Sequence, residues 1–234
     1  KGYPTDIDLI VSDEGYGANE FIKTKNPLVI ITGPGPGSGK LATCLSQLYH
    51  EHKRGANAGY AKFETFPIWS IPLKHPANVA YEAATADLRD FNMIDPFHLA
   101  AYGEQTVNYN RDVEVFPVLL RILNRITGGD AVYQSPTEMG GNRAGFAIVN
   151  DNVVREAAKQ EVIRRFFRYA CEYAVGLVER EAAQRAELLM EELGMRAEDR
   201  RVVGPARAAA AEAEATGKGN EGVFVGAAVE LADG

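Results

Sequence analysis

The residues best suited to chemistry form one glycine-rich segment that ends in lysine, Gly33-Pro34-Gly35-Pro36-Gly37-Ser38-Gly39-Lys40. An apolar run, residues 28–32, precedes it, and a stretch with helical spacing of apolar residues, 41–53, follows it. Glycines let backbone N–H groups converge on a phosphate, a helix N-terminus adds a partial positive charge, and lysine adds a full one. The segment therefore predicts a phosphate-binding loop between a strand and a helix.

The segment departs at two positions from the usual nucleotide-binding pattern, G-x-x-x-x-G-K-[ST]. Pro34 stands where the first glycine is expected, and Leu41 replaces the Ser or Thr that holds Mg²⁺. Thr43 supplies the nearest hydroxyl, about one helical turn further on. The pattern thus favours an anion-binding loop more strongly than an ATPase.

Acidic residues that follow two predicted strands are candidates for the same site. Asp13 and Glu14 follow the run 7–12 and are candidate Mg²⁺ ligands, although a plain polar turn explains them as well. Glu64 stands near the end of the alternating run 60–66. In a parallel sheet this end would face the loop, because ligands bind at the carboxyl ends of the strands.

Basic and amide side chains in two polar segments complete the candidate set. Arg111 opens a predicted helix, where a cation opposes the helix dipole, so an anion contact competes with a plain surface role. Asn142 and Arg143 lie in a second glycine-rich loop, 135–145. We assign phosphate or nucleotide binding to Gly33, Gly35, Gly37, Ser38, Gly39, Lys40, Thr43, Asn142 and Arg143, metal binding to Thr43, Asp13 and Glu14, and catalysis to Lys40, Arg111 and Glu64.

The elements that must position these residues predict an α/β fold, part of a doubly wound parallel sheet with a phosphate-binding-type loop. The predicted strands are the runs 7–12, 27–32 and 60–66. Helical patterns at 41–53, 77–90, 96–102 and 113–126 separate or follow them. The predicted domains are an α/β region at 1–150, a helical subdomain at 151–216 with three helices, and the first strand of a truncated α/β domain at 217–234.

Composition restricts the partners. The chain has 234 residues, 24% of them charged, with a net charge of −7, which disfavours binding to nucleic acid. It has no apolar run of the roughly 20 residues that a membrane span needs. Its two cysteines suit free thiols in the cytoplasm. The expected partner is a small phosphorylated ligand, and homo-oligomer formation is left open.

Four runs of the sequence resemble the bacterial family known as domain of unknown function 1846, a group of uncharacterised proteins. They are residues 1–17, 33–43, 61–67 and 108–112. The resemblance extends over essentially the whole chain, and it implies that members are longer at both ends, so that this chain is an internal fragment. It implies further strand–helix units on the N-terminal side and another α/β domain on the C-terminal side, but no activity.

Three functions are compatible with these residues. The first is a nucleotide-dependent transferase or hydrolase that uses ATP or GTP with Mg²⁺, in which Arg111 or Arg143 neutralises the transferred phosphoryl group. The second is metal-independent binding of a phosphorylated metabolite or dinucleotide. The third is a structural or assembly role without a ligand.

Overall fold

The computed structural model describes residues 2–35, 37–63, 66–129 and 132–231, and the chain is mostly helical. Within these residues the sheet consists of two short antiparallel strands, β1 (Asn92–Ile94) and β2 (Val107–Tyr109). The predicted doubly wound parallel sheet is therefore wrong, and with it the placing of the glycine-rich loop in such a sheet.

Each predicted strand that carried the α/β interpretation is absent from the described residues. Residues 7–10 form a short helix, α1 (Ile7–Ile10), because the Asp6 carboxylate accepts a hydrogen bond from the Leu9 amide and caps a helical turn. The run 27–32 is extended and unpaired in any sheet, with Leu28 and Ile30 each 76% exposed. Residues 60–63 and 223–229 are likewise outside any strand, and residues 64–65 lie outside the described part.

The chain divides into two compact units. Unit 1 comprises residues 1–65 and 94–142, and unit 2 comprises residues 66–93 and 143–234. The predicted division at residues 150 and 216 stays a prediction.

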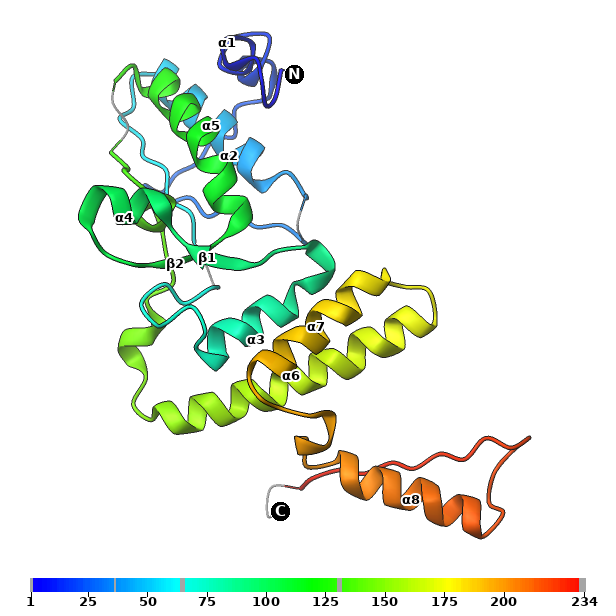
Figure 1. Ribbon diagram of the computed structural model, residues 1–234. Coiled ribbons are helices and arrows are strands. Elements are labelled where there is room, and N and C mark those ends of the chain that lie inside the picture. Colours follow the sequence, from blue (N-terminus) through cyan, green and yellow to red (C-terminus); the bar gives the residue numbers. More distant parts are fainter. Residues whose placement is uncertain (1, 36, 64–65, 130–131, 232–234) are drawn as a thin grey trace. The chain divides into compact units, whose positions relative to one another are not determined.

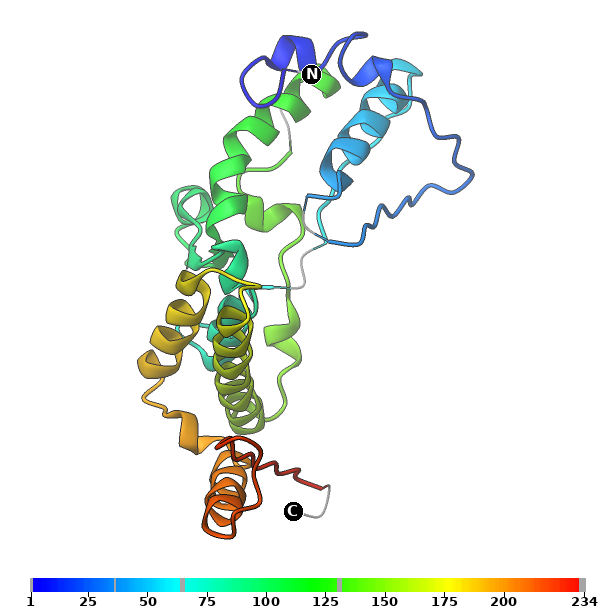
Figure 2. The ribbon, with the colours of Figure 1, turned by 90° about the vertical axis from the view of Figure 1, so that its right-hand side faces the viewer.

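Unit 1 is built around two longer helices, α2 (Lys40–Lys53) and α5 (Asn110–Thr127), which pack side by side (Figures 1 and 2). Apolar residues three or four positions apart form one stripe on each helix and meet in the core. The buried core residues of the two helices are Leu45, Leu48 and Tyr49 from α2 and Phe116, Leu119, Ile122 and Leu123 from α5.

A third helix of unit 1, α4 (Pro96–Tyr102), begins where the sequence predicts it. Asp95 caps it through hydrogen bonds from the amides of Phe97 and His98, and Pro96 takes the first helical position. The second carboxylate oxygen of Asp95 accepts hydrogen bonds from the amide and hydroxyl of Thr137. The fully buried Asp95 therefore joins α4 to the segment that follows α5.

Unit 2 is a helical assembly of α3 (Pro76–Ala84), α6 (Asp151–Ala174) and α7 (Arg180–Glu192), with α8 (Val203–Ala215) following. The helices predicted from residue 151 onward are confirmed. Their core is apolar and almost fully buried, and it contains Val79, Ala83, Val162, Ile163 and Leu189. In the described part of the chain, short 3₁₀ helices form at Tyr16–Ala18, Ala86–Leu88, Pro136–Met139, Ala144–Ala147 and Ala197–Asp199.

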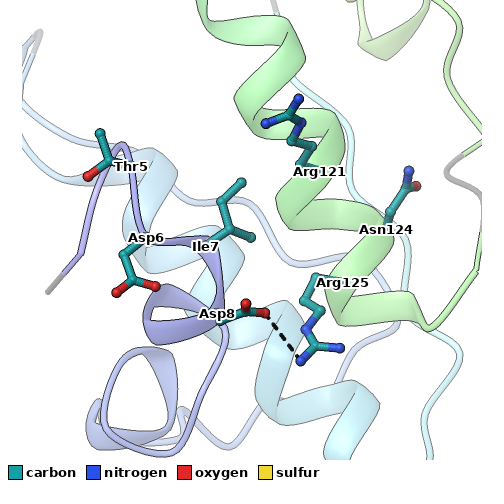
Figure 3. Close-up of a pocket in the computed structure, with 7 residues that line it drawn as sticks. All are labelled: Thr5, Asp6, Ile7, Asp8, Arg121, Asn124 and Arg125. Carbon is teal, nitrogen blue, oxygen red and sulfur yellow. Dashed lines mark ion pairs between the residues drawn. The ribbon is translucent and has the colours of Figure 1, made fainter.

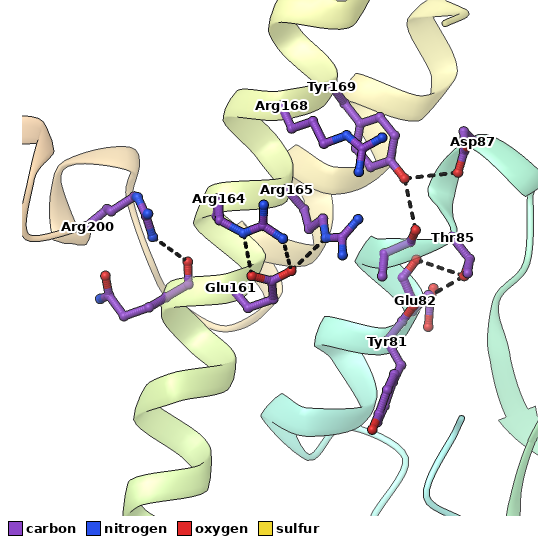
Figure 4. A network of polar contacts seen from close by, with 12 residues as sticks. Tyr81, Glu82, Thr85, Asp87, Glu161, Arg164, Arg165, Arg168, Tyr169 and Arg200 are labelled. Atoms are coloured by element: carbon purple, nitrogen blue, oxygen red, sulfur yellow. Dashed lines mark hydrogen bonds and ion pairs between the residues drawn. The ribbon is translucent and has the colours of Figure 1, made fainter. Parts of the chain in front are cut away.

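Polar contacts flank this helical core (Figure 4). The Tyr169 hydroxyl lies 3.1 Å from the Ala84 carbonyl oxygen and 2.9 Å from Asp87 Oδ1, and so ties α6 to the end of α3. Burial first, and then the contact with Asp87, raises the pKa of Tyr169 to about 12. Nearer the start of α6, Glu161 pairs with Arg164 and Arg165 on its own helix. These contacts stabilise the helical packing of unit 2.

Candidate phosphate-binding site

The glycine-rich segment forms the entrance to α2. Gly37 and Gly39 have φ angles of +72° and +89°, in the left-handed region that other residues avoid. Gly39 is the N-cap of α2 and has no side chain to cap it, and among the described residues no side-chain cap of this turn is seen. The first intrahelical bond runs from the Thr43 amide to the Gly39 carbonyl, at 2.9 Å. The earlier amides of this turn are therefore available to an anion.

Lys40 folds back over this loop. Its Nζ donates to the Gly35 carbonyl oxygen at 2.7 Å and to Ser38 Oγ at 3.1 Å, and the Ser38 hydroxyl also donates to Gly35 O, at 2.8 Å. A Cβ at Gly33 would lie too close to Ser38 Oγ, so the Ser38 side chain would have to shift. No side-chain atom crowds Gly35, Gly37 or Gly39. The predicted loop residues thus lie together, with a cation beside the open end of a helix; Pro36 lies outside the described residues.

The N-terminal segment contacts the C-terminal ends of both long helices, which shows that α2 and α5 run in the same direction. Asp8 pairs with Arg125 in the last turn of α5, at 3.3 Å. Five residues later, Asp13 pairs with Lys53 in the last turn of α2 and accepts a hydrogen bond from the Tyr49 hydroxyl at 3.0 Å. Because α2 and α5 both end near this segment and pack together, their N-termini lie toward the same, opposite end of unit 1 (Figures 1 and 2).

A cluster of polar side chains lies at the N-terminal end of α5. Lys62 Nζ donates to the Tyr109 hydroxyl at 2.7 Å and forms an ion pair with the buried Asp112. The Arg111 guanidinium lies 5.8 Å from the centre of the Tyr109 ring. The structure thus brings Lys40 and Arg111 to one end of unit 1 and adds Lys62, which sequence reasoning missed.

The backbone of Lys62 is held by the segment after α5. Its amide donates to the Met139 carbonyl at 2.8 Å, and a side chain at Gly140, whose φ is +152°, would collide with the Lys62 carbonyl oxygen. Asn142 follows two residues later and is the last residue of unit 1. The sequence feature that could have indicated Lys62 is its position in the alternating run 60–66, two residues before the candidate Glu64. Glu64 itself lies outside the described residues.

The predicted metal ligands are not brought together. Asp13 and its neighbour Glu14 lie at the C-terminal end of α2, whereas Thr43 lies in the first turn. The ten residues from Thr43 to Lys53 span about 15 Å at 1.5 Å per residue. Hydrogen bonds from Lys53 and then from Tyr49 lower the pKa of Asp13, as expected for a carboxylate engaged by a lysine. In the described part of the chain, no three His, Cys, Asp or Glu side chains are grouped as metal ligands.

Arg143 belongs to unit 2, where its guanidinium lies 5.7 Å from the centre of the Trp69 ring. The structure therefore accounts for this side chain by a cation–π contact within unit 2. Its predicted role in phosphate binding stays a prediction.

A surface depression at the other end of unit 1 is less suited to an anion (Figure 3). It is lined by Thr5, Asp6, Ile7 and Asp8 from the α1 region and by Arg121, Asn124 and Arg125 from α5. The C-terminus of a helix carries a partial negative charge, and Arg125 is already paired with Asp8. The candidate phosphate site is therefore the N-terminal end of α2.

The chain belongs to a family of unknown function, whose N-terminal model, "Domain of unknown function DUF1846, N-terminal", matches residues 1–194. It is similar to proteins of Clostridium botulinum named "UPF0371 protein". It is 62% identical over 234 residues to those of strains ATCC 19397 and Langeland and 58% identical to that of strain Alaska E43. In each case the match covers the whole of this chain and 46% of the relative, so the chain spans about half the length of the curated relatives it matches. In the part of the chain that the structure describes, no helix has the length and apolar character to span a membrane.

Proposed function

We propose that unit 1 binds the phosphate of a nucleotide or another phosphorylated metabolite at the N-terminus of α2. The observation that carries the proposal is the uncapped first turn of α2 with the Lys40 ammonium beside it. Backbone amides and the helix dipole favour an anion there, and the glycines leave space for it to approach. Lys40 exchanges its contact with the Gly35 carbonyl for one with the phosphate.

Binding in this site is independent of Mg²⁺. The carboxylates Asp13 and Glu14 lie near the opposite end of α2, and Leu41 occupies the position where a metal-binding hydroxyl is expected. The negative charge of the phosphate is offset by the protein, through Lys40 and the helix N-terminus. This favours a site for a phosphorylated ligand over a typical metal-dependent NTPase.

Phosphoryl transfer is the second candidate function. Arg111 favours it, because a guanidinium at the same end of unit 1 as Lys40 can stabilise charge that develops on a transferred group. These residues do not indicate the chemical class of the acceptor substrate.

Isothermal titration calorimetry with ATP and with inorganic phosphate tests the proposal, in the presence of Mg²⁺ and in EDTA. We expect binding in both buffers and a loss of about 10–100-fold in affinity for Lys40→Ala, since a charge-assisted hydrogen bond is removed. Lys53→Ala is the matched control, because it removes the same charge from the other end of α2. Failure of both ligands to bind, to this chain and to a full-length family member, would contradict the proposal.

A further inference from the structure

Asp112 is an acidic residue that is buried in the first turn of α5, 9% exposed. One of its carboxylate oxygens, Oδ1, is paired with Lys62. The other, Oδ2, is shielded from solvent and has no hydrogen-bond partner in the described structure. Buried polar atoms are nearly always hydrogen-bonded, and an ionised carboxylate oxygen can only accept. We therefore expect Oδ2 to bind a hydrogen-bond donor.

Asp112 lies at about the same level as the phosphate-binding loop along the two packed helices. Lys40 and Asp112 are each 13 residues before the side chains, Lys53 and Arg125, that the segment 8–13 contacts. Thirteen residues of helix span about 20 Å, so both residues lie about 20 Å from the same end of the unit. The helices α2 and α5 contact each other, and packed helices have axes about 8–10 Å apart.

We propose that Oδ2 of Asp112 accepts a hydrogen bond from a ribose hydroxyl of a nucleotide whose phosphates lie on the first turn of α2. This inference rests on the proposed phosphate site and names the class of ligand that fills it. A hydroxyl is a donor, as a carboxylate oxygen requires, whereas a phosphate dianion offers only acceptors. Lys62 keeps its ion pair with Oδ1, and a shift of its side chain, which is 31% exposed, opens access to Oδ2.

The competing explanation is an ordered water on Oδ2 and a purely structural Lys62–Asp112 pair. Calorimetry with ATP and 2′,3′-dideoxy-ATP separates the two, because these ligands differ only in the ribose hydroxyls. For the wild-type chain we expect ATP to bind about tenfold or more tightly than its dideoxy analogue, as for one hydrogen bond to a charged group.

Two variants that each remove one carboxylate charge near the start of α5 complete the test. Asp112→Asn should remove the preference for ATP over the dideoxy analogue, whereas Glu114→Gln, on the exposed face of α5, should keep it. Circular dichroism establishes whether both variants are folded. The comparison of the two nucleotides on the wild-type chain tests the inference even if a variant does not fold.

Equal wild-type affinities for the two nucleotides, or a preference that survives Asp112→Asn, would overturn the inference and leave the phosphate site intact. Binding of inorganic phosphate without binding of ATP would do the same. Failure of ATP, the dideoxy analogue and phosphate alike would overturn both proposals.

Discussion

The two glycines that flank α2 offer a sharp test of the loop, since they share a backbone conformation and differ in their place. Gly39 begins the helix with φ +89°, and Gly55 follows its last turn with φ +82°. Gly55 closes a Schellman motif, in which its amide bonds to the His52 carbonyl and the Ala56 amide to that of Glu51. A Cβ would meet no atom within 4 Å at either glycine, so alanine introduces backbone strain without a steric collision.

We expect Gly39→Ala and Gly55→Ala to destabilise the chain by similar amounts. The left-handed conformation costs an L-residue about 1–2 kcal/mol, and the smaller entropy of unfolded alanine offsets part of that cost. A net loss of about 1 kcal/mol lowers the melting temperature of a chain of this size by about 2–4 °C. Thermal unfolding followed by circular dichroism measures the shift.

Only Gly39→Ala should affect the binding of phosphate. If alanine leaves the left-handed region, the amides of the first turn no longer point at the ligand. The free energy of binding then weakens by up to the cost of holding alanine in the left-handed conformation. A strain of about 1–2 kcal/mol corresponds to about 5–30-fold in affinity. Equal losses of affinity in both variants, or a destabilised Gly39→Ala that binds phosphate normally, would refute the role of the loop.

Two further predictions concern stability. Burial raises the pKa of Glu138, whereas hydrogen bonds from Tyr102 and the Gln134 amide lower it. The lowering effects together are larger, so the pKa lies below the ordinary 4.5. Its stabilising contribution is therefore present above pH 4.5 and lost as the pH falls through the folded pKa, and the melting temperatures of wild type and Glu138→Gln should converge on acidification. Tyr169→Phe removes the contacts with Ala84 and Asp87 and should cost about 1 kcal/mol in urea unfolding, whereas Tyr173→Phe, exposed on the same helix, should be neutral.

The helices could be predicted because their signals are local. Apolar spacing and an N-cap occupy a few neighbouring residues, as at Asp95 before α4 and at Asn150, whose side chain accepts from the Val153 amide at 3.3 Å before α6. A strand depends on a partner that is distant in sequence. Residues 28–30 have the composition of a buried strand, yet they are exposed, because no strand pairs with them in the described structure.

The candidate site was only partly predictable for the same reason. Lys40 could be identified from the spacing of its loop, but the pair of Lys62 and Asp112 joins residues 50 positions apart, and no local pattern reveals it. The prediction that Asp13 and Glu14 lie near the loop depends on residues 7–12 forming a strand. The helix that forms there instead leads them to the C-terminal end of α2.

The distribution of charge along α2 and α5 connects these observations to the choice between metal-dependent and metal-independent binding. Lys40, Lys62 and Arg111 lie at the end where both helices begin, whereas Asp8 and Asp13 lie where both helices end. Mg²⁺ binds through carboxylates together with phosphates, so a site for it needs acidic side chains beside the ligand. Here the carboxylate beside the site, Asp112, is already paired with Lys62, and the helix N-termini add further positive charge. A phosphate at this end therefore meets cations supplied by the protein, which is the physical reason to expect its binding to persist in EDTA.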